Sequence, residues 1–399
     1  MLGASARTYV LATSLVTVAV LALSGCSADK VLKTSGDGDA ASASPTPKTF
    51  EAKLSMNVRP GARNVGVDRK VRVRIRGGEL QNVTVKGPGG QVPGKLATNS
   101  AIWKATGLLR PAARYTVNAL AVGDNGVRKE FKRTFRTQKL TLDQQTYPSF
   151  SPIAGQTVGI AMPVIVRFDV PVTDKATIQK HLQVVSQPAQ VGAWHWISDN
   201  EVHWRPKKYW QANTKVTVKA DIGGVPAGNG IYGQLDREET FNIGRAQVTK
   251  VNLDTHELKV YRSGKLIRTI PITAGSEPKY TTRSGTKVII EKDRRHDMNS
   301  ETIGIDPNSA DGYNLKGVEY AMRLTYSGEF LHAAPWSVAS QGHTNVSHGC
   351  TGMSTANAGW LYNNSMIGDP VEYTGTNNYM TLTNGYGDWN ESFSEYANS

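Results

Sequence analysis

The stretch KVRVRIR, residues 70–76, alternates basic and branched apolar side chains. A period of two places the apolar residues on one face of a strand and the basic residues on the other. Similar runs, NVTVKG at 82–87 and RYTVNALAV at 114–122, are separated by Gly, Pro and Asn turns. The pattern predicts an all-β, Ig-like sandwich over residues 51–138.

A second unit of the same kind follows over residues 139–245. Runs such as VIVRFDVPV at 164–172 and TKVTVKADI at 214–222 again consist of short strands that end at turn residues. We therefore expect two tandem Ig-like sandwiches. Such domains act as spacers or as binding modules, and nothing in these runs decides between the two roles.

The third section, residues 246–375, is β-rich as well. It contains a tight hairpin that turns at Ser263-Gly264, and further short strands follow. Only TANAGWLYNNSM, residues 355–366, has the apolar stripe of a helix. The whole chain is therefore predicted to be mainly β.

The N-terminal residues indicate export. Arg7 precedes an apolar run, and LSGC follows at 23–26, an order typical of a secretory signal. The segment resembles the bacterial lipoprotein processing box, in which the cysteine, here Cys26, becomes a lipid anchor. An ordinary signal peptide or a membrane helix is the alternative, although the apolar run is short for a span of about 20 residues. We expect a signal peptide over residues 1–25 and a disordered tether over 26–50, at the outer face of the cytoplasmic membrane.

The chain of 399 residues has a formal net charge of +13. A positive charge of this size favours anionic partners. For an exported lipoprotein we expect anionic wall polymers or lipid headgroups as partners, and no nucleic acid. The simpler interpretation of the basic residues at 69–76 is a solvated strand face.

Cys350 is one of only two cysteines in the chain. With Cys26 modified by lipid, the exported protein has no intrachain disulfide to form. A free thiol outside the cytoplasm is open to oxidation, so its presence indicates that reactivity matters more than packing. Cys350 is therefore a candidate nucleophile.

Three histidines are candidate bases for this thiol. His348 leaves the same face of an extended strand as Cys350, and His332 ends a predicted strand, where catalytic residues are common. His343 is the third candidate. A metal site of His343, His348 and Cys350 is the alternative, but no acidic ligand or Cys-x-x-Cys pair accompanies them. We prefer His332 as the base and expect no metal.

Backbone groups near the cysteine are expected to assist. Gly349 lets the chain approach a substrate closely. Backbone N–H groups of the turn at 347–352 can stabilise an oxyanion, and the positive end of the following helix is expected to lower the pKa of Cys350.

The segments HAAPW at 332–336 and SHGC at 347–350 resemble the active-site signature of the L,D-transpeptidases, the YkuD-type enzymes that cross-link cell walls. The resemblance extends over residues 246–399, and two sandwiches behind a lipoprotein box resemble the longer members of the family. It implies that Cys350 is the acyl-forming nucleophile and that His332 takes its proton.

Further residues are assigned by the same resemblance. The backbone carbonyl of Ala333 orients His332. His348 and Gly349 occupy the centre of the signature, with oxyanion-binding backbone N–H groups around Gly349 and Cys350, and Ser347 occupies its small hydroxyl position.

The resemblance also implies which residues bind substrate or support the site. Met298 and Tyr313 fall where the family has a mobile flap over the substrate channel, and Trp336 and Asn345 match residues that pack the loop around the site. Gly352 departs from the family, which commonly has Asn or Arg two residues after the cysteine. A side-chain contact to substrate is expected to be absent there.

The residues after the third domain, 376–399, resemble a tail that packs on the catalytic domain, with Trp389 as its anchor.

The function that the resemblance implies is a peptidoglycan L,D-transpeptidase. Such an enzyme releases D-Ala from tetrapeptide stems, holds the acyl group as a cysteine thioester and forms 3→3 cross-links. The resemblance implies no cofactor, and it implies carbapenem β-lactams as covalent inhibitors. An L,D-carboxypeptidase would use the same residues with water as the acceptor. A non-catalytic wall-binding lipoprotein is the other alternative, based on the sandwiches, the basic charge and Gly352.

Overall fold

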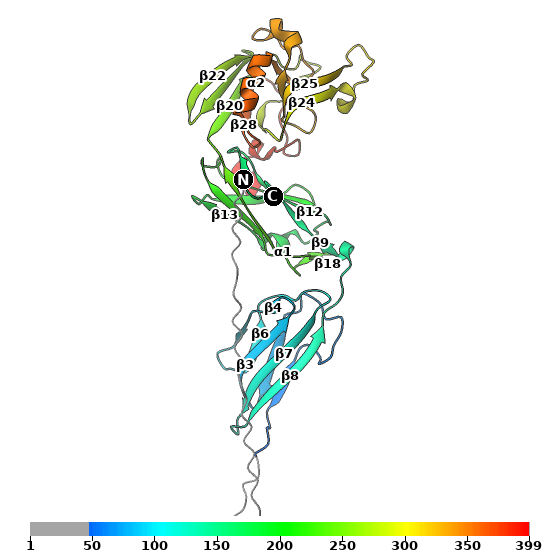
Figure 1. Cartoon of the computed structure of the whole chain (residues 1–399), viewed down its shortest axis with the longest axis vertical. Coiled ribbons are helices and arrows are strands. Elements are labelled where there is room, and N and C mark those ends of the chain that lie inside the picture. Colours follow the sequence, from blue (N-terminus) through cyan, green and yellow to red (C-terminus); the bar gives the residue numbers. More distant parts are fainter. Residues whose placement is uncertain (1–47, 399) are drawn as a thin grey trace, which may run out of the picture. The chain divides into compact units, whose positions relative to one another are not determined.

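Strands dominate the structure, a computed structural model that describes residues 48–398 (Figure 1). They occur in three successive parts of the chain, which we call the first sandwich (53–136), the second sandwich (145–243) and the C-terminal domain (247–374). The residues that follow, 376–398, are the C-terminal tail. The prediction of a mainly β chain is confirmed.

The predicted signal peptide at residues 1–25, the predicted lipid attachment at Cys26 and the tether up to residue 47 lie outside the described residues. Within residues 48–398, no helix is long and apolar enough to cross a membrane.

The first sandwich consists of two four-stranded sheets that share one apolar core. In β2, Val73 and Ile75 are buried while Arg72, Arg74 and Arg76 are exposed, as the alternation in the sequence requires. The sheet orders are β1-β2-β6-β5 and β4-β3-β7-β8. The strands are β1 Lys53–Met56, β2 Arg72–Arg76, β3 Gly78–Gly87, β4 Gly90–Gln91, β5 Gly94–Leu96, β6 Ile102–Ala105, β7 Arg114–Gly123 and β8 Arg128–Arg136.

The second sandwich has two four-stranded sheets, β10-β12-β15-β14 and β11-β19-β16-β13, and a small sheet β17-β18-β9. It contains a short helix, α1, that the sequence did not predict; the Asp174 carboxylate caps it by accepting the Thr177 N–H. The elements are η1 Leu142–Gln144, β9 Gln145–Thr146, β10 Pro148–Ser151, β11 Thr157–Val158, β12 Val164–Phe168, α1 Lys175–Gln179, β13 Leu182–Gln187, β14 Gly192–Trp196, β15 Glu201–Pro206, β16 Lys215–Ala220, β17 Pro226–Gly228, β18 Ile231–Gly233 and β19 Arg237–Ile243.

The C-terminal domain is built from a five-stranded sheet, β22-β21-β20-β28-β23, and a four-stranded sheet, β24-β25-β26-β27. The predicted hairpin is present between β21 and β22, where Ser263 (φ 48°) and Gly264 (φ 79°) both have positive φ, as a tight primed turn requires. The elements are β20 Gln247–Asn252, β21 Glu257–Arg262, β22 Lys265–Pro271, β23 Gly285–Val288, β24 Glu291–Asn299, η2 Ser300–Ile303, β25 Asn314–Arg323, β26 Phe330–Ala333, η3 Pro335–Ser340, β27 Thr351–Met353, α2 Thr355–Asn364 and β28 Pro370–Thr374.

Helix α2 is the helix expected after the cysteine, and it ends two residues earlier than predicted, at Asn364. Ser354 caps it by accepting the Asn357 N–H. Ala358 and Leu361 are fully buried in the core of the C-terminal domain. The helix is thus held against strands β25, β26 and β27.

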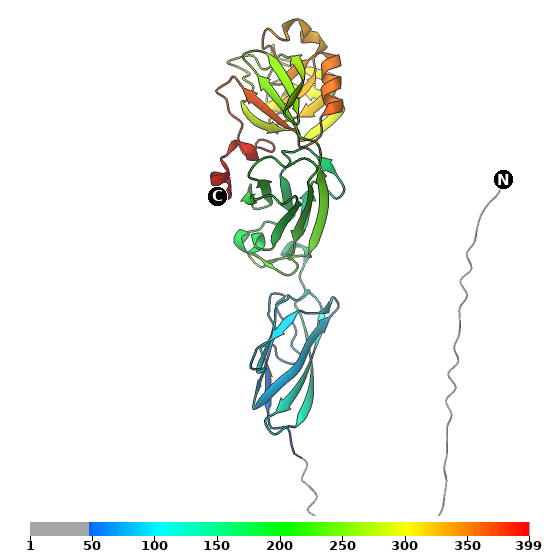
Figure 2. The ribbon, with the colours of Figure 1, turned by 90° about the vertical axis from the view of Figure 1, so that its left-hand side faces the viewer.

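The C-terminal tail contacts the second sandwich as well as the C-terminal domain, so the expectation that it packs on the catalytic domain was incomplete. Trp389 donates its indole N–H to the carbonyl of Ala161 in the second sandwich, at 2.8 Å. Asn390 donates to the carbonyl of Thr286 in the C-terminal domain, also at 2.8 Å. The tail contains η4 Asp388–Asn390 and α3 Phe393–Asn398, and α3 packs on β14 (Figure 2). Ala161 and Thr286 are far from the tail in the sequence, and no sequence motif indicated these contacts.

Candidate active site

Two paired strands bring the predicted nucleophile and base together. Strand β26 carries His332 and pairs in parallel with β27, which begins one residue after Cys350. Both side chains line one pocket. The other lining residues are Thr273, Met298, Tyr313, Leu315, Ala334, Trp336, Ser337, Val346, Ser347, His348 and Gly352.

The imidazole of His332 is buried and held in one orientation. Its Nδ1 lies 2.8 Å from the carbonyl oxygen of Ala333, and its ring stacks on Trp336 with centroids 5.9 Å apart. Because a carbonyl can only accept, Nδ1 carries the proton and Nε2 has a free lone pair. Burial lowers the pKa of His332, and the hydrogen bond to Ala333 opposes that effect only in part. The ring is therefore neutral near pH 7 and can accept a proton at Nε2.

The thiol of Cys350 is protonated in this resting site. Its Sγ donates to the backbone carbonyl of Gly328 at 3.4 Å. Burial raises the pKa of the thiol to about 12 and Glu329 adds to the rise, whereas a backbone hydrogen bond with Phe330 and the charges of Lys287 and Arg323 oppose it. The expectation that the following helix lowers this pKa was wrong: strand β27 separates Cys350 from α2, and a helix end acts only over its own first turn.

The turn before the cysteine is fixed by the hydroxyl of Ser347. This oxygen accepts the Gly349 N–H at 3.1 Å and donates to the Cys350 carbonyl at 2.6 Å. Gly349 has φ +119°, a conformation that favours glycine, and its carbonyl accepts a hydrogen bond from Thr282 at 2.9 Å. Within residues 48–398 the N–H of Cys350 donates to no protein acceptor, whereas that of Gly349 is occupied. Of the two N–H groups expected to bind an oxyanion, that of Cys350 is the available one.

The ring of His348 lies between two tyrosines, 4.3 Å from Tyr280 and 5.1 Å from Tyr313, centroid to centroid. Burial raises the pKa of Tyr313 to about 12, so its hydroxyl remains protonated. Met298, in β24, is 8 % exposed and lines the same pocket. The two predicted flap residues therefore lie at the active-site pocket.

A second pocket lies beyond His348 and Gly349. Its lining is polar and includes two basic residues that sequence reasoning did not identify, Lys279 and Arg283. The remaining lining residues are Pro278, Tyr280, Thr281, Thr302, Ile303, Ser327, Gly328, Glu329 and Asn378.

A buried ion pair next to the thiol was also missed. Lys287, fully buried, pairs with Glu329, which is 5 % exposed and also bonds to Arg283 at 3.0 Å. The Lys287 ammonium lies over the ring of Tyr373, 3.7 Å from its centroid. Burial lowers the pKa of Lys287, although Glu329 opposes the shift. The available signal was a single charge inside each of two apolar runs, GTKVII and GEFLHAA.

Three other predicted residues have distinct placements. Trp336 is 58 % exposed at the pocket, and its ring stacks on that of His332. Asn345 does not line the pocket; its side-chain oxygen accepts the Ala274 N–H at 3.0 Å and holds the loop. Gly352 lines the pocket, and a Cβ there would lie 2.7 Å from the Cβ of Ala334.

His343 is exposed and does not line the pocket. Within the part of the chain that the structure describes, no three His, Cys, Asp or Glu side chains are grouped so that they could hold a metal ion.

Comparisons with known proteins agree with this architecture. Residues 246–372 match the L,D-transpeptidase catalytic domain, and residues 62–226 match the bacterial Ig domain. L,D-transpeptidase 2 of Mycobacterium tuberculosis (strain CDC 1551 / Oshkosh) is 35% identical over 340 residues, which cover 85% of this chain and 82% of that protein. L,D-transpeptidase 5 of M. tuberculosis (strain ATCC 25618 / H37Rv) is 34% identical over 322 residues, 79% of this chain and 69% of that protein.

Among solved structures, that of L,D-transpeptidase LdtMt1 in complex with imipenem is similar, with 37% identity and a TM-score of 0.51, over 58% of this chain and 99% of that chain. Ig-like sandwiches followed by an L,D-transpeptidase catalytic domain define the class of this protein. This chain belongs to the L,D-transpeptidase family, and it is an L,D-transpeptidase.

Proposed function

We propose that this enzyme forms 3→3 cross-links in peptidoglycan through a thioester at Cys350. The observation that carries the proposal is the placement of Cys350 and His332 in one pocket, with Nδ1 of His332 bonded to Ala333 so that Nε2 remains free. A general base must present a lone pair towards the proton that it removes.

In the first half-reaction, Nε2 of His332 takes the thiol proton as Sγ attacks the carbonyl carbon of the third stem residue. The resulting oxyanion accepts the N–H of Cys350, and the C–N bond to D-Ala then breaks. The imidazolium returns its proton to the departing amine. A thioester, free D-Ala and a neutral His332 result.

In the second half-reaction, the side-chain amine of the third residue of a neighbouring stem attacks the thioester. Nε2 of His332 accepts the proton that this amine loses, the S–C bond breaks, and the proton passes to the departing sulfur. The new amide is the 3→3 cross-link, and the thiol is regenerated.

Because thiol and imidazole are both neutral at rest, proton transfer accompanies attack instead of preceding it. Sγ must leave its bond to Gly328 to meet Nε2 of His332. Met298 and Tyr313, on the strand pair β24 and β25 and the segment between them, border the pocket and can exclude water from the thioester once a stem is bound. Exclusion of water favours the amine acceptor over hydrolysis.

The same thiol is the proposed target of carbapenems. The similar enzyme LdtMt1 was solved in complex with imipenem. Attack of Sγ on the β-lactam carbonyl would follow the same steps, with opening of the ring in place of release of D-Ala. The covalent adduct is then expected at Cys350.

Export and lipid anchoring complete the proposal. The LSGC segment and the apolar run before it support cleavage ahead of Cys26 and lipid modification of that residue. The catalytic domain would then act in the wall from the outer face of the cytoplasmic membrane.

Mass spectrometry of residues 49–399, which form one compact unit, tests the chemistry. After incubation with a disaccharide tetrapeptide, we expect loss of D-Ala together with a tetrapeptide–tripeptide dimer. Cys350→Ala should give neither product and should take up no imipenem. Tripeptide without dimer would identify a carboxypeptidase, and turnover by Cys350→Ala would refute the nucleophile.

A further inference from the structure

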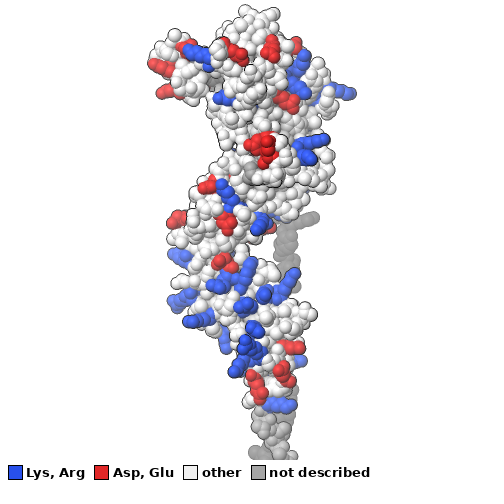
Figure 3. Space-filling view, turned by 180° about the vertical axis from the view of Figure 1, so that it is seen from behind, with Lys and Arg blue, Asp and Glu red and all other residues white. Residues whose placement is uncertain are grey.

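The first sandwich holds the whole net positive charge of the chain. Residues 49–138 contain 18 Lys and Arg against five Asp and Glu, and the rest of the chain contains equal numbers of the two kinds. Lys and Arg gather over this part of the molecule in Figure 3. Among residues 48–138 no Lys or Arg forms an ion pair with Asp or Glu, whereas such pairs occur in both later domains. The Lys and Arg side chains of the first sandwich are therefore available to bind an external partner.

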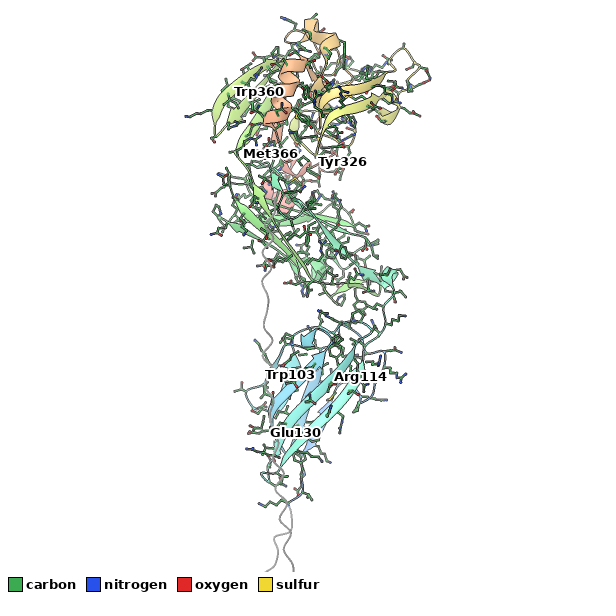
Figure 4. All side chains as sticks on the ribbon, viewed as in Figure 1. Trp103, Arg114, Glu130, Tyr326, Trp360 and Met366 are labelled. Carbon is green, nitrogen blue, oxygen red and sulfur yellow. The ribbon has the colours of Figure 1, made fainter. Side chains whose placement is uncertain are left out.

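One outer face concentrates this charge without any acidic residue. It belongs to the sheet β1-β2-β6-β5, whose four strands contain no Asp or Glu. We call its exposed basic residues the basic face: Lys53, Arg72, Arg74, Arg76, Lys95 and Lys104. On the other sheet, exposed Glu79 and Glu130 lie among the basic residues; Figure 4 labels Glu130 and Arg114 of that sheet.

The strand register places like charges directly opposite one another on the basic face. Lys104 stands opposite Arg72 on one side and opposite Lys95 on the other, and Lys53 stands opposite Arg76. Like charges in such positions destabilise a sheet. Lys95 and Lys104 also line a pocket on this face. Folding alone gives no reason for this arrangement, whereas a bound anion would relieve the repulsion.

We propose that the basic face binds a linear polyanion of the cell wall that carries repeated phosphate groups. The three arginines of β2 point outward at alternate positions, about 7 Å apart along the strand, and the neighbouring strands add lysines at about 4.8 Å. A guanidinium group can donate two parallel hydrogen bonds to two oxygens of one phosphate group. A row of such groups fits a chain with regularly spaced charges, and it would hold the enzyme at wall polymer independently of its active site.

A flat lipid surface fits this face less well. Proteins that bind membrane surfaces insert apolar side chains below the headgroups. Among residues 48–138, Leu96 is the only large apolar residue that is exposed, at 39%. The basic face therefore carries charge but lacks the exposed apolar side chains that would insert into a bilayer.

The test compares two variants that lose the same charge on opposite faces. The face variant is Arg72→Gln, Arg74→Gln and Lys104→Gln. The control variant is Lys86→Gln, Arg128→Gln and Lys132→Gln, on exposed positions of the other sheet. The probe is fluorescent long-chain inorganic polyphosphate, and its binding to residues 49–399 is followed by anisotropy between about 50 mM and about 200 mM salt.

We expect the native protein to bind polyphosphate with an affinity that falls steeply as salt rises. The face variant should bind at least about tenfold more weakly, with a salt slope lower by roughly two for three lost phosphate contacts, and the control within about twofold. Purified wall should retain the native protein better than the face variant, and this difference should disappear once phosphodiester-linked polymers are removed. Unchanged release of D-Ala by both variants would separate this result from the proposed catalysis.

If the face variant and the control variant lost the same affinity for polyphosphate, the proposal would be overturned. Binding would then depend on the overall charge of the domain and not on the basic face. Binding to vesicles of phosphatidylcholine and phosphatidylglycerol without binding to polyphosphate would overturn it in favour of a lipid surface. Equal retention of the native protein and the face variant on intact wall would do so as well.

Discussion

The Nδ1 atom of His332 lies 2.8 Å from the carbonyl oxygen of Ala333, the next residue in β26. A residue bonded to its own neighbour cannot rotate its ring without losing that bond, so strand geometry sets the direction in which Nε2 points. The neutral ring and the neutral thiol of Cys350 together make the resting site an uncharged pair.

This uncharged pair predicts the pH profile of acylation. Because burial lowers the pKa of His332 below 6.5, its base form should persist to more acidic pH than that of a free histidine. Because burial raises the pKa of Cys350 to about 12, no titration of the thiol should appear near 9.0, where an unperturbed thiol titrates. We expect the rate of imipenem acylation, measured by intact mass, to fall only below pH 6.5 and to be flat up to pH 9.0. A rise through pH 9.0 would contradict a neutral resting pair.

Replacing His332 and His343 separately should distinguish the base from a surface residue. His332→Ala removes the buried ring in the pocket, and acylation should slow by about 10²- to 10⁴-fold, as for loss of a general base. His343→Ala alters an exposed side chain outside the pocket and should change the rate by less than about threefold. Thermal unfolding of both variants serves as the control for folding. A His343→Ala enzyme as slow as His332→Ala would show that the base has been misassigned.

Ser347 should act by positioning the nucleophile. Ser347→Ala removes the hydroxyl that joins the Gly349 N–H to the Cys350 carbonyl, which frees the turn before the thiol. Acylation should fall by about 10- to 100-fold, because small displacements of a reacting group have effects of this size. Ser347→Thr keeps the hydroxyl and should recover most of the rate. If the alanine and threonine variants are equally slow, the hydroxyl is not the cause.

Gly352 should tolerate no side chain unless Ala334, which packs against it, is replaced by glycine. The Cβ of Gly352→Ala would lie 2.7 Å from that of Ala334 and 3.4 Å from the Thr273 methyl group. We expect a loss of about 1–3 kcal/mol in the free energy of unfolding and slower acylation, since β27 and the loop after His332 must shift. Adding Ala334→Gly removes the clash and should restore stability. Unaltered stability of Gly352→Ala would show that this strand moves freely.

The link between the tail and the second sandwich should depend on pH. His203 lies 2.9 Å from Asp388 and 2.7 Å from Glu201. Burial alone would lower the pKa of His203, but the two carboxylates outweigh it and raise the pKa to about 9. A raised pKa contributes stability that is fully present below the unfolded value of 6.5 and is lost as pH rises through about 9.

Denaturant unfolding between those two pH values measures this contribution. We expect a loss of roughly 2–3 kcal/mol across the window, and a clearly smaller loss in Asp388→Asn, which lacks one of the two carboxylates. Identical pH dependence in the two proteins would mean that His203 is not charged in the folded state.

The proposed catalytic residues could be found in the sequence because they stand in short motifs whose chemistry is local. Cys350 is the only cysteine among residues 48–398, and His332 is followed by the residue whose carbonyl it uses. The Ser263-Gly264 turn and the Ser354 cap likewise depend on neighbours in the chain, so alternation and turn chemistry were sufficient to place them. The strands of the first sandwich follow from the same rule.

The protonation state of Cys350 depended instead on tertiary structure. Local sequence suggested a helix end that lowers its pKa, whereas burial, which the whole fold determines, raises it. The Lys287–Glu329 pair joins residues 42 apart in the chain, and Trp389 bonds to a residue 228 positions away.

Sequence by itself thus determined the strands, the turns, the family and the choice of Cys350 and His332 as the proposed reactive groups, because these follow from the order of neighbouring residues. Only tertiary structure decided which charges are buried together, that the tail joins two domains, that Gly352 is packed against Ala334 and that one face of the first sandwich carries unopposed charge. The physical reason is that burial and electrostatic energies depend on distances in space, which chain order alone does not specify.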